Sequence, residues 1–486
     1  MGGKVGPFGL GRLGVVLVVA AIFLLAPSMG STAHAIGPTL PIPPPVHNHR
    51  TGVTIPGGNG PSGVTFDPVN GELYVADFGS SNVSVINTTT NHIVAQIPLS
   101  YGLETIVTDT ATGVVYTANT FSTVYAISPV TNQVAWTTSV AAAGCPTGCA
   151  PKVQTYDSAN GDIYVTDLAT DYASVIHGSA VVATIPVGMS PNGATYDSAN
   201  GEVYVANEGS LNLTVIDGAT NTVTGDIATV STGPGLAYDG ANGNVYLCSN
   251  AAQAGQSNFV TVINGTTNKV AASIRVVDQC GGAVYDPEDG YVYMTNPYEP
   301  GSEAFLSSVS LFDPVSNQVV LTLPVESAPI GIAYDSVNDK VYVANLESNT
   351  ISILPQLYLL TVHETGLPSG TDWSATLGGV TVWSTSSTIT LPEPSGTFNF
   401  TIGQAANLSA NPSSGSVEIS GGPGWLNVTF SKGGGGGLLG LPGTTGYYVL
   451  VGIGAIAAIL VGVFVVLTRR KRRAKPLAVV PPGRAP

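Results

Sequence analysis

The sequence is poor in charged residues, and in positively charged residues above all. Only 9% of its 486 residues are charged, where a soluble domain usually carries about 25%, and 15 Lys or Arg stand against 30 Asp or Glu. Because 44% of the residues are hydrophobic, this scarcity excludes a disordered acidic chain and an ordinary charged cytosolic enzyme. It also excludes a nucleic-acid-binding protein that works through a basic face.

Histidine and catalytic motifs are lacking as well. The six histidines are scattered, whereas copper- or haem-bearing sites need several histidines close together. No nucleophile elbow, phosphate-binding loop or zinc motif occurs in the sequence. We therefore expect a protein that is not an enzyme and that needs no cofactor.

The few basic residues lie mostly at the two ends of the chain. Seven of the fifteen occupy positions 469–486, and Lys4 and Arg12 precede the first apolar run. The stretch 36–446 holds the remaining six together with all 30 acidic residues, which gives it a net charge of −24. Such asymmetry indicates a protein that crosses a compartment boundary.

The N-terminus has the layout of a secretory signal peptide. The apolar run Leu13–Ala26 follows the two basic residues, and Ala33-His34-Ala35 forms a small-x-small cleavage site. We therefore interpret residues 1–35 as a cleaved signal peptide, with an uncleaved anchor helix as the alternative. A proline-rich leader, residues 36–50, follows it.

The C-terminal region predicts a membrane anchor. Tyr447–Leu467 is 21 residues long without a charge, enough to span a bilayer as one helix. The basic tail, residues 468–486, follows at once and places the C-terminus in the cytoplasm by the positive-inside rule. The prediction is a single-pass cell-membrane protein with its ectodomain outside.

Between these ends the sequence repeats with a period of 40 to 49 residues. An Asp recurs seven times, and a Tyr follows each Asp by seven residues. The Asp residues are Asp67, Asp109, Asp157, Asp197, Asp239, Asp286 and Asp335, and the Tyr residues are Tyr74, Tyr116, Tyr164, Tyr204, Tyr246, Tyr293 and Tyr342. Each unit reads as four short strands, which is typical of a propeller blade, so the sequence predicts an all-β fold with a seven-bladed β-propeller over residues 51–356.

The repeat core resembles the YVTN family of β-propeller repeats. Tyr164-Val-Thr-Asp167 differs from the Tyr-Val-Thr-Asn core at one residue, and Tyr204-Val-Ala-Asn207 and Tyr342-Val-Ala-Asn345 are close to it. This resemblance implies an archaeal or bacterial cell-surface setting.

The last unit lacks a fourth strand. Thr51–Pro56 precedes the first unit and matches the fourth-strand ending Val182–Pro186. We expect this N-terminal strand to pair with the outer edge of the last blade, which would close the ring and remove an exposed edge.

The features found in every unit are predicted to be structural. Each repeated Asp opens a hairpin, of the form Asp-x-x-x-Gly in six units and Asp-x-x-x-Asp at Asp335, where an Asp side chain commonly bonds nearby backbone amides in an Asx-type turn. The repeated Tyr residues are expected to pack between adjacent blades. A binding site, if the propeller has one, should therefore lie where the repeat is broken.

Three insertions break the repeat, in the segments Ser139–Lys152, Asn250–Asn258 and Asn296–Ser308. In an up-and-down blade all three emerge on one face, and we take that face as the candidate binding surface. Its most distinctive residues are Tyr298, Glu299, Glu303 and Phe305. Neutral growth of the loops is the alternative.

The four cysteines are expected to form disulfides, because an exported protein meets oxidising conditions. Cys145 and Cys149 are a local pair, and Cys248 and Cys280 lie at neighbouring strand ends of adjacent blades. A four-thiolate metal site or a redox Cys-x-x-x-Cys is the alternative.

After the propeller, residues 357–431 contain six alternating runs, which predict a small β-sandwich that serves as a stalk. The segment Glu364–Trp373 resembles a module repeated in surface and secreted proteins of thermoacidophilic archaea. A Gly-rich linker, residues 432–446, leads to the membrane.

Seven Asn-x-Ser/Thr sequons are candidate glycosylation sites: Asn82, Asn87, Asn212, Asn264, Asn399, Asn407 and Asn427.

The sequence thus predicts a membrane-anchored surface protein that binds a cell-envelope protein or glycan, or is associated with a surface layer. An exported propeller hydrolase, such as a lactonase, is the alternative function. Because few basic residues are present to pair with carboxylates, we also expect an acid-tolerant ectodomain.

Overall fold

A computed structural model describes residues 53–140, 150–249, 258–276, 278–298, 305–403, 405 and 407–432. The chain divides into two compact units, Met1–Gln356 and Leu357–Pro486. The expected signal peptide, proline-rich leader, transmembrane helix and cytoplasmic tail lie outside the described residues, as does the Gly-rich linker apart from Lys432. Within the described ranges, no helix has the length and apolar character needed to cross a membrane.

The described part of the first unit forms seven four-stranded antiparallel sheets. The first three are β2 (Pro61–Asp67), β3 (Glu72–Asp77), β4 (Asn82–Asn87) and β5 (His92–Pro98); β6 (Ile106–Thr108), β7 (Val115–Ala118), β8 (Thr123–Ser128) and β9 (Gln133–Ser139); and β10 (Pro151–Asp157), β11 (Asp162–Asp167), β12 (Tyr172–His177) and β13 (Ala180–Pro186). The next three are β14 (Pro191–Asp197), β15 (Glu202–Asn207), β16 (Asn212–Asp217) and β17 (Thr222–Ala228); β18 (Gly235–Asp239), β19 (Asn244–Ser249), β20 (Asn258–Asn264) and β21 (Lys269–Val276); and β22 (Ala283–Tyr285), β23 (Val292–Tyr298), β24 (Phe305–Asp313) and β25 (Gln318–Pro324). The last comprises β26 (Pro329–Asp335), β27 (Lys340–Asn345), β28 (Thr350–Leu354) and β1 (Val53–Pro56).

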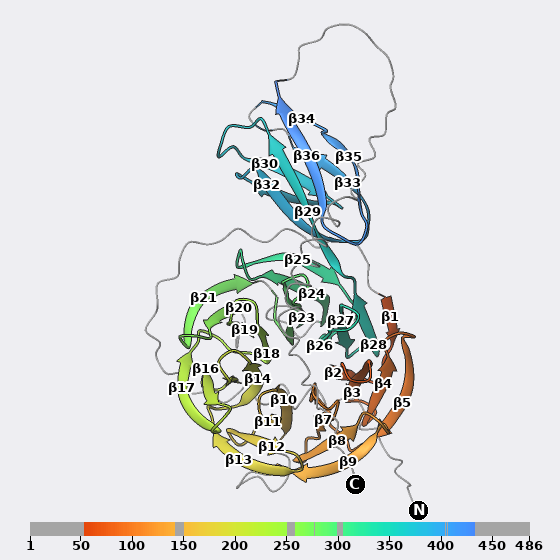
Figure 1. Cartoon of the computed structure of the whole chain (residues 1–486), viewed down its shortest axis with the longest axis vertical. Helices are drawn as coiled ribbons and strands as arrows, with labels where there is room; N and C mark the ends of the chain where they lie inside the picture. Colours follow the sequence, from red (N-terminus) through yellow and green to blue (C-terminus); the bar gives the residue numbers. More distant parts are fainter. Residues whose placement is uncertain are drawn as a thin grey trace, which may run out of the picture. The chain divides into compact units, whose positions relative to one another are not determined.

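The sheets follow one another around a ring (Figure 1). The first strand of each sheet contacts the first strand of the next, and β26 contacts β2. Glycine permits this close approach: a Cβ on Gly193 would lie 2.5 Å from the carbonyl oxygen of Pro234, and one on Gly331 would lie 2.5 Å from that of Ser62. The inner strands are therefore packed backbone against backbone at these junctions.

The N-terminal strand closes the ring, as the sequence predicted. Strand β1 pairs antiparallel with β28, with Val53 opposite Ile353 and Pro56 opposite Thr350. The last sheet is thus assembled from both ends of the unit, and its outer edge is covered by the first strand of the chain.

The prediction for the repeated Asp residues is confirmed. In each of the seven hairpins the Asp Oδ1 accepts a hydrogen bond from the backbone N–H two residues further on, at 2.8–2.9 Å. In Asp67, Asp157 and Asp197, for example, the donors are Val69, Ala159 and Ala199. These carboxylates are turn caps.

The repeated Tyr residues pack between sheets, as expected. Tyr74, in β3, is fully buried in a cluster that includes Ile106 and Val115 of the next sheet. Tyr164 in β11 packs in the same way, and its hydroxyl donates to Asn221 Oδ1 at 2.6 Å across the junction. Each such Tyr contributes a large buried side chain to the core that joins two sheets.

The second unit consists of two four-stranded sheets around one core. Strands β32 (Thr388–Pro394), β29 (Leu357–Thr365), β36 (Gly424–Ser431) and β34 (Ser409–Asn411) form one sheet. Strands β31 (Val380–Ser384), β30 (Trp373–Leu377), β33 (Gly396–Ile402) and β35 (Ser414–Ile419) form the other. Their inward side chains, with the buried Trp373 and Phe430 among them, make one hydrophobic cluster. The sequence had indicated six of these eight strands and missed β31 and β34.

Candidate binding face of the first unit

One face of the ring carries the turns between second and third strands together with the links from one sheet to the next. We call it the insertion-bearing face, because all three insertions join it. The segment 141–149 lies between β9 and β10, 250–257 between β19 and β20, and 299–304 between β23 and β24. Their structure lies outside the described residues, but the strands that flank them are described.

The four residues singled out from the sequence are only partly described. Tyr298 ends β23, is half-buried, and its backbone pairs with that of Phe305 at the start of β24. Glu299 and Glu303 lie in the segment outside the described residues. The structure therefore places the strands that lead to this part of the candidate surface, and the surface itself stays a prediction.

Exposed apolar side chains lie on the described part of this face. Phe121 is 59% exposed in the turn between β7 and β8, and Leu211 is 43% exposed in the turn between β15 and β16. Tyr101, Met189 and Val230 are each at least half exposed in links between sheets. The ring of Tyr101 lies 5.4 Å from that of Phe78, centroid to centroid. Sequence reasoning missed these residues because it looked for insertions and not for substitutions within turns of ordinary length.

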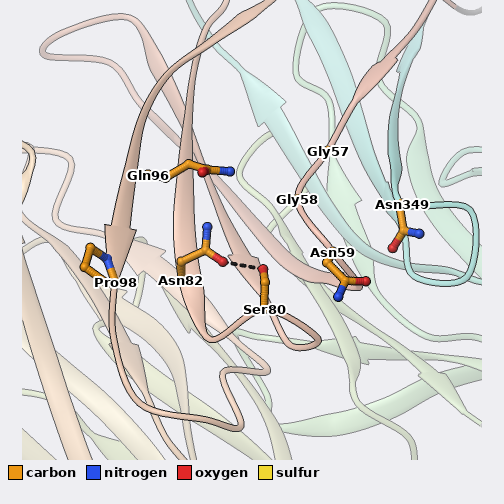
Figure 2. Close-up of a pocket in the computed structure, with 8 residues that line it drawn as sticks. All are labelled: Gly57, Gly58, Asn59, Ser80, Asn82, Gln96, Pro98 and Asn349. Atoms are coloured by element: carbon orange, nitrogen blue, oxygen red, sulfur yellow. Dashed lines mark hydrogen bonds between the residues drawn. The ribbon is translucent and has the colours of Figure 1, made fainter. Parts of the chain in front are cut away.

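An open groove of about 750 Å³ lies where the ring closes. It is lined by Gly57, Gly58, Asn59, Ser80, Asn82, Gln96, Pro98 and Asn349. Figure 2 shows the amide side chains of Asn59, Asn82, Gln96 and Asn349 reaching it from the β1–β2 link, from β4 and β5, and from the β27–β28 turn. The lining is thus rich in neutral hydrogen-bond donors and acceptors and carries no charged side chain.

A charged cluster stands at the beginning of the inner strands. The Lys152 ammonium lies 2.9 Å from the Glu104 carboxylate of the preceding sheet, and Asn192 donates to Glu208 at 2.8 Å. Burial alone would lower the pKa of Lys152, but the charge of Glu104 and its hydrogen bond to Lys152 raise the pKa by more, so the net shift is upward. Burial raises the pKa of Glu208, against the effects of Asn192 and Lys152. These charged groups are partly buried, so their fields are less screened than those of fully exposed side chains and can orient a polar ligand.

Cys248 and Cys280 form a disulfide at this face. Cys248 lies in β19 and Cys280 precedes β22, so the bond links two adjacent sheets. Cys145 and Cys149 lie outside the described residues. In the described part of the chain, no group of three or more His, Cys, Asp or Glu residues is placed to hold a metal ion.

Comparison with known proteins agrees with this architecture. The NHL repeat family matches residues 59–86, which span β2, β3 and most of β4. No curated protein matches the sequence. Among solved structures, the fold is similar to a chain of Kuenenia stuttgartiensis hydrazine synthase, with a TM-score of 0.51, 17% identity, and coverage of 64% of this chain and 98% of that one. It is also similar to a chain in a crystal structure of the mitotic checkpoint complex, with a TM-score of 0.51, 8% identity, and coverage of 66% and 98%.

At these identities the structural likeness shows the fold alone. Together with the repeat match and the ring of four-stranded sheets, it defines the class of the protein. The chain is a β-propeller repeat protein.

Proposed function

We propose that this chain is an exported, membrane-anchored surface protein whose seven-bladed propeller binds a cell-envelope protein or glycan through its insertion-bearing face. In this proposal residues 1–35 are removed as a signal peptide, residues 447–467 span the membrane once, and the C-terminus stays in the cytoplasm. The YVTN-like repeat core supports an archaeal or bacterial surface setting.

The observation that carries the binding role is the difference between the two faces of the ring. On the opposite face the turns between first and second strands repeat one Asp-capped design, and the exposed apolar side chains there are single valines such as Val69 and Val130. The insertion-bearing face combines exposed aromatic rings, an amide-lined groove and the Lys152–Glu104 pair. Aromatic side chains and convergent polar groups are typical of binding surfaces.

Binding of the ectodomain (residues 36–446) to isolated cell envelopes tests this role. The variant Phe121→Ser removes an exposed ring from the insertion-bearing face, and Val130→Ser is its matched control, because Val130 is 90% exposed on the opposite face. We expect F121S to weaken binding about tenfold, the loss of one well-placed aromatic anchor, and V130S to bind as the parent does. The reverse pattern would assign binding to the opposite face.

Export and anchoring have separate readouts. The N-terminus of the mature chain should begin at Ile36, and the protein should be released from membranes by detergent but not by high salt. A mature chain that keeps residues 1–35 would instead support the uncleaved anchor.

A further inference from the structure

The seven sequons differ in the solvent exposure and the hydrogen bonding of their Asn and hydroxyl side chains. The four in the propeller have Asn side chains that already serve the fold. Asn87 Oδ1 accepts from the backbone N–H of Thr90 at 2.9 Å, and Asn264 Oδ1 accepts from that of Thr267 at 2.9 Å. Asn212 donates to Asp226 Oδ1 at 2.9 Å, and Asn82 accepts from the hydroxyl of Ser80. A sugar is joined to the side-chain nitrogen, so at Asn212 it would compete with the bond to Asp226, whereas at the other three it would have to be accommodated beside an amide whose Oδ1 is held by a turn.

The hydroxyl of the sequon is also engaged in two propeller sites. Ser84, which completes the sequon of Asn82, is fully buried and donates to Asp77 Oδ2 at 2.6 Å. Thr214, which completes that of Asn212, is 2% exposed and donates to Asp226 at 2.9 Å. A transferase that must hold both the Asn and the hydroxyl cannot reach these two in the folded protein.

The three sequons of the second unit are open to solvent. Asn399, Asn407 and Asn427 are all exposed. At Asn427 both the Asn and the sequon hydroxyl are exposed, because β36 alternates strictly and places Trp425, Asn427 and Thr429 on its outer face. The Thr429 hydroxyl shares a 3.2 Å hydrogen bond with that of Thr365 but, unlike Ser84 and Thr214, it is not buried. The Asn427 amide forms no hydrogen bond with another described residue, so it is available to react.

Trp425 distinguishes Asn427 from the other six sites. Trp425 is 56% exposed and lies two residues before Asn427 on the same face, about 7 Å along the strand. The other six sequons have Ser, Val, Thr or Ala in that position and no aromatic residue. Thr361 stands opposite Trp425, and His363 opposite Asn427, on the neighbouring strand β29.

We propose that Asn427 is the principal N-glycosylation site of the chain and that its first sugar stacks on the exposed indole of Trp425. A pyranose ring joined to the Asn427 nitrogen is long enough to reach back over Trp425, where its C–H face would cover apolar surface that is otherwise exposed to water.

The reaction has a simple balance. The Asn427 side-chain nitrogen forms a bond to C1 of an oligosaccharide carried on a lipid phosphate, while the bond between C1 and the phosphate oxygen breaks. The lipid phosphate leaves with the bonding electrons, and the amide proton passes to a base of the transferase. The proposal rests on export, which is part of the proposed function, and not on the binding role of the propeller.

Glycopeptide mass spectrometry of the full chain, isolated from the cells that produce it, tests the site. We expect Asn427 to be occupied in most molecules, Asn399 to a smaller extent, and Asn212 not at all. Failure of export is recognised in the same sample, because residues 1–35 would be retained and Cys248 and Cys280 would be free thiols. An oxidised, processed chain with unmodified Asn427 overturns the glycan proposal and leaves export intact.

Tryptophan fluorescence tests the stacking. Cleavage of the Asn–sugar bond by a glycoamidase should shift the emission of the parent chain to longer wavelength as Trp425 becomes wetted. The shift should persist in Trp383→Phe, since Trp383 is 68% exposed on β31, and vanish in Trp425→Phe. A shift that persists in W425F, or no shift in the parent, would show that the sugar does not cover Trp425.

Discussion

Replacing Asp77 by Asn should stabilise the propeller at neutral pH and reduce the stability that the parent chain gains in acid. Asp77 ends β3, and its side chain is fully buried. The hydroxyl of Ser84 donates to its Oδ2 at 2.6 Å. Burial raises the pKa of Asp77 to about 7, although bonds from Ser84 and from backbone amides partly oppose the shift.

The direction of the pH dependence follows from this raised pKa. Between the unfolded pKa of 3.8 and the folded pKa of about 7, the folded chain binds the proton more tightly than the unfolded chain does. The free energy of unfolding therefore falls as the pH rises through this window, and the contribution of Asp77 is fully present only below it. Burial raises the pKa of Glu393 to about 7 in the second unit, which acts in the same direction there.

The magnitude can be bounded. A shift of about 3 pKa units corresponds to about 4 kcal/mol at most, at 1.36 kcal/mol per unit. Asparagine fits the site, because Asn119, Asn207 and Asn345 occupy the equivalent position in other sheets. Asn207, for example, donates to the hydroxyl of Thr214 at 3.0 Å, and Thr214 is the counterpart of Ser84.

Denaturant unfolding of the ectodomain at pH 4.5 and pH 7.5 measures the effect. We expect the parent to be more stable at pH 4.5, and D77N to be more stable than the parent at pH 7.5 by up to about 4 kcal/mol. Glu418→Gln, which removes an exposed carboxylate, is the control and should leave the difference between the two pH values unchanged. A parent chain that is less stable at pH 4.5, or a D77N chain with the parental pH dependence, would refute the reasoning.

Two further pairs of variants test the ring itself. Tyr164→Phe should cost about 1–2 kcal/mol of unfolding free energy, because it removes the 2.6 Å bond to Asn221, whereas Tyr342→Phe should be neutral or slightly stabilising, because the Tyr342 hydroxyl is buried without a partner. Equal losses in denaturant unfolding would show that the cross-sheet bond contributes nothing specific. Gly193→Ala should reduce the free energy of unfolding by about 1–3 kcal/mol and so lower the melting temperature, because the added Cβ would lie 2.5 Å from the carbonyl oxygen of Pro234. Gly225→Ala should change the melting temperature little, because a Cβ at Gly225 would meet open space. A stable G193A chain would argue that the inner strands are free to separate.

The repeated structure could be predicted from the sequence because its determinants are local. The Asp-capped hairpins fix their own geometry through bonds two to four residues apart, so seven copies in phase suffice to place the strands. The pairing of β1 with β28 was predictable because the last unit was one strand short. In the second unit, β34 was missed because three residues carry no alternation that can be recognised. Strand β31 did have a signal, because Gly378-Gly379 is the two-residue hairpin turn that joins it to β30, and both glycines have positive φ.

The candidate site was harder to predict because its contacts are not local. Glu104 and Lys152 are 48 residues apart, one in the link before β6 and the other in β10, and neither is unusual in its local sequence. Each stands five residues before the repeated Asp of its unit, so an alignment of the units would have placed the two opposite charges at the same position of adjacent repeats. The groove gives no such signal, since Gly57 and Asn349 meet only because the two ends of the ring do.

A further regularity concerns the residue before each repeated Asp. From the third sheet onward it is Tyr, and Tyr156, Tyr196 and Tyr238 each lie near the Asp of the preceding sheet, as Tyr156 does near Asp109. Burial and the nearby carboxylate together raise the pKa of Tyr196 to about 12, so the hydroxyl keeps its proton. Each of these junctions thus brings together a hydroxyl and a carboxylate that both belong to the repeat.

The sheet β2–β5 lacks this link on both sides, since Phe66 and Thr108 replace the Tyr. At the second junction Asp67 Oδ2 is buried without a partner, and burial raises the pKa of Asp67. The same sheet carries Asp77 and one wall of the groove. In a ring of similar units each sheet contacts only its neighbours. A residue that no longer makes the repeated contact can therefore be substituted without weakening the other junctions. The released contacts lie at the Asp-capped turns of the opposite face, whereas the groove lies on the insertion-bearing face, so this sheet departs from the shared contacts at the end of its strands that is remote from the groove.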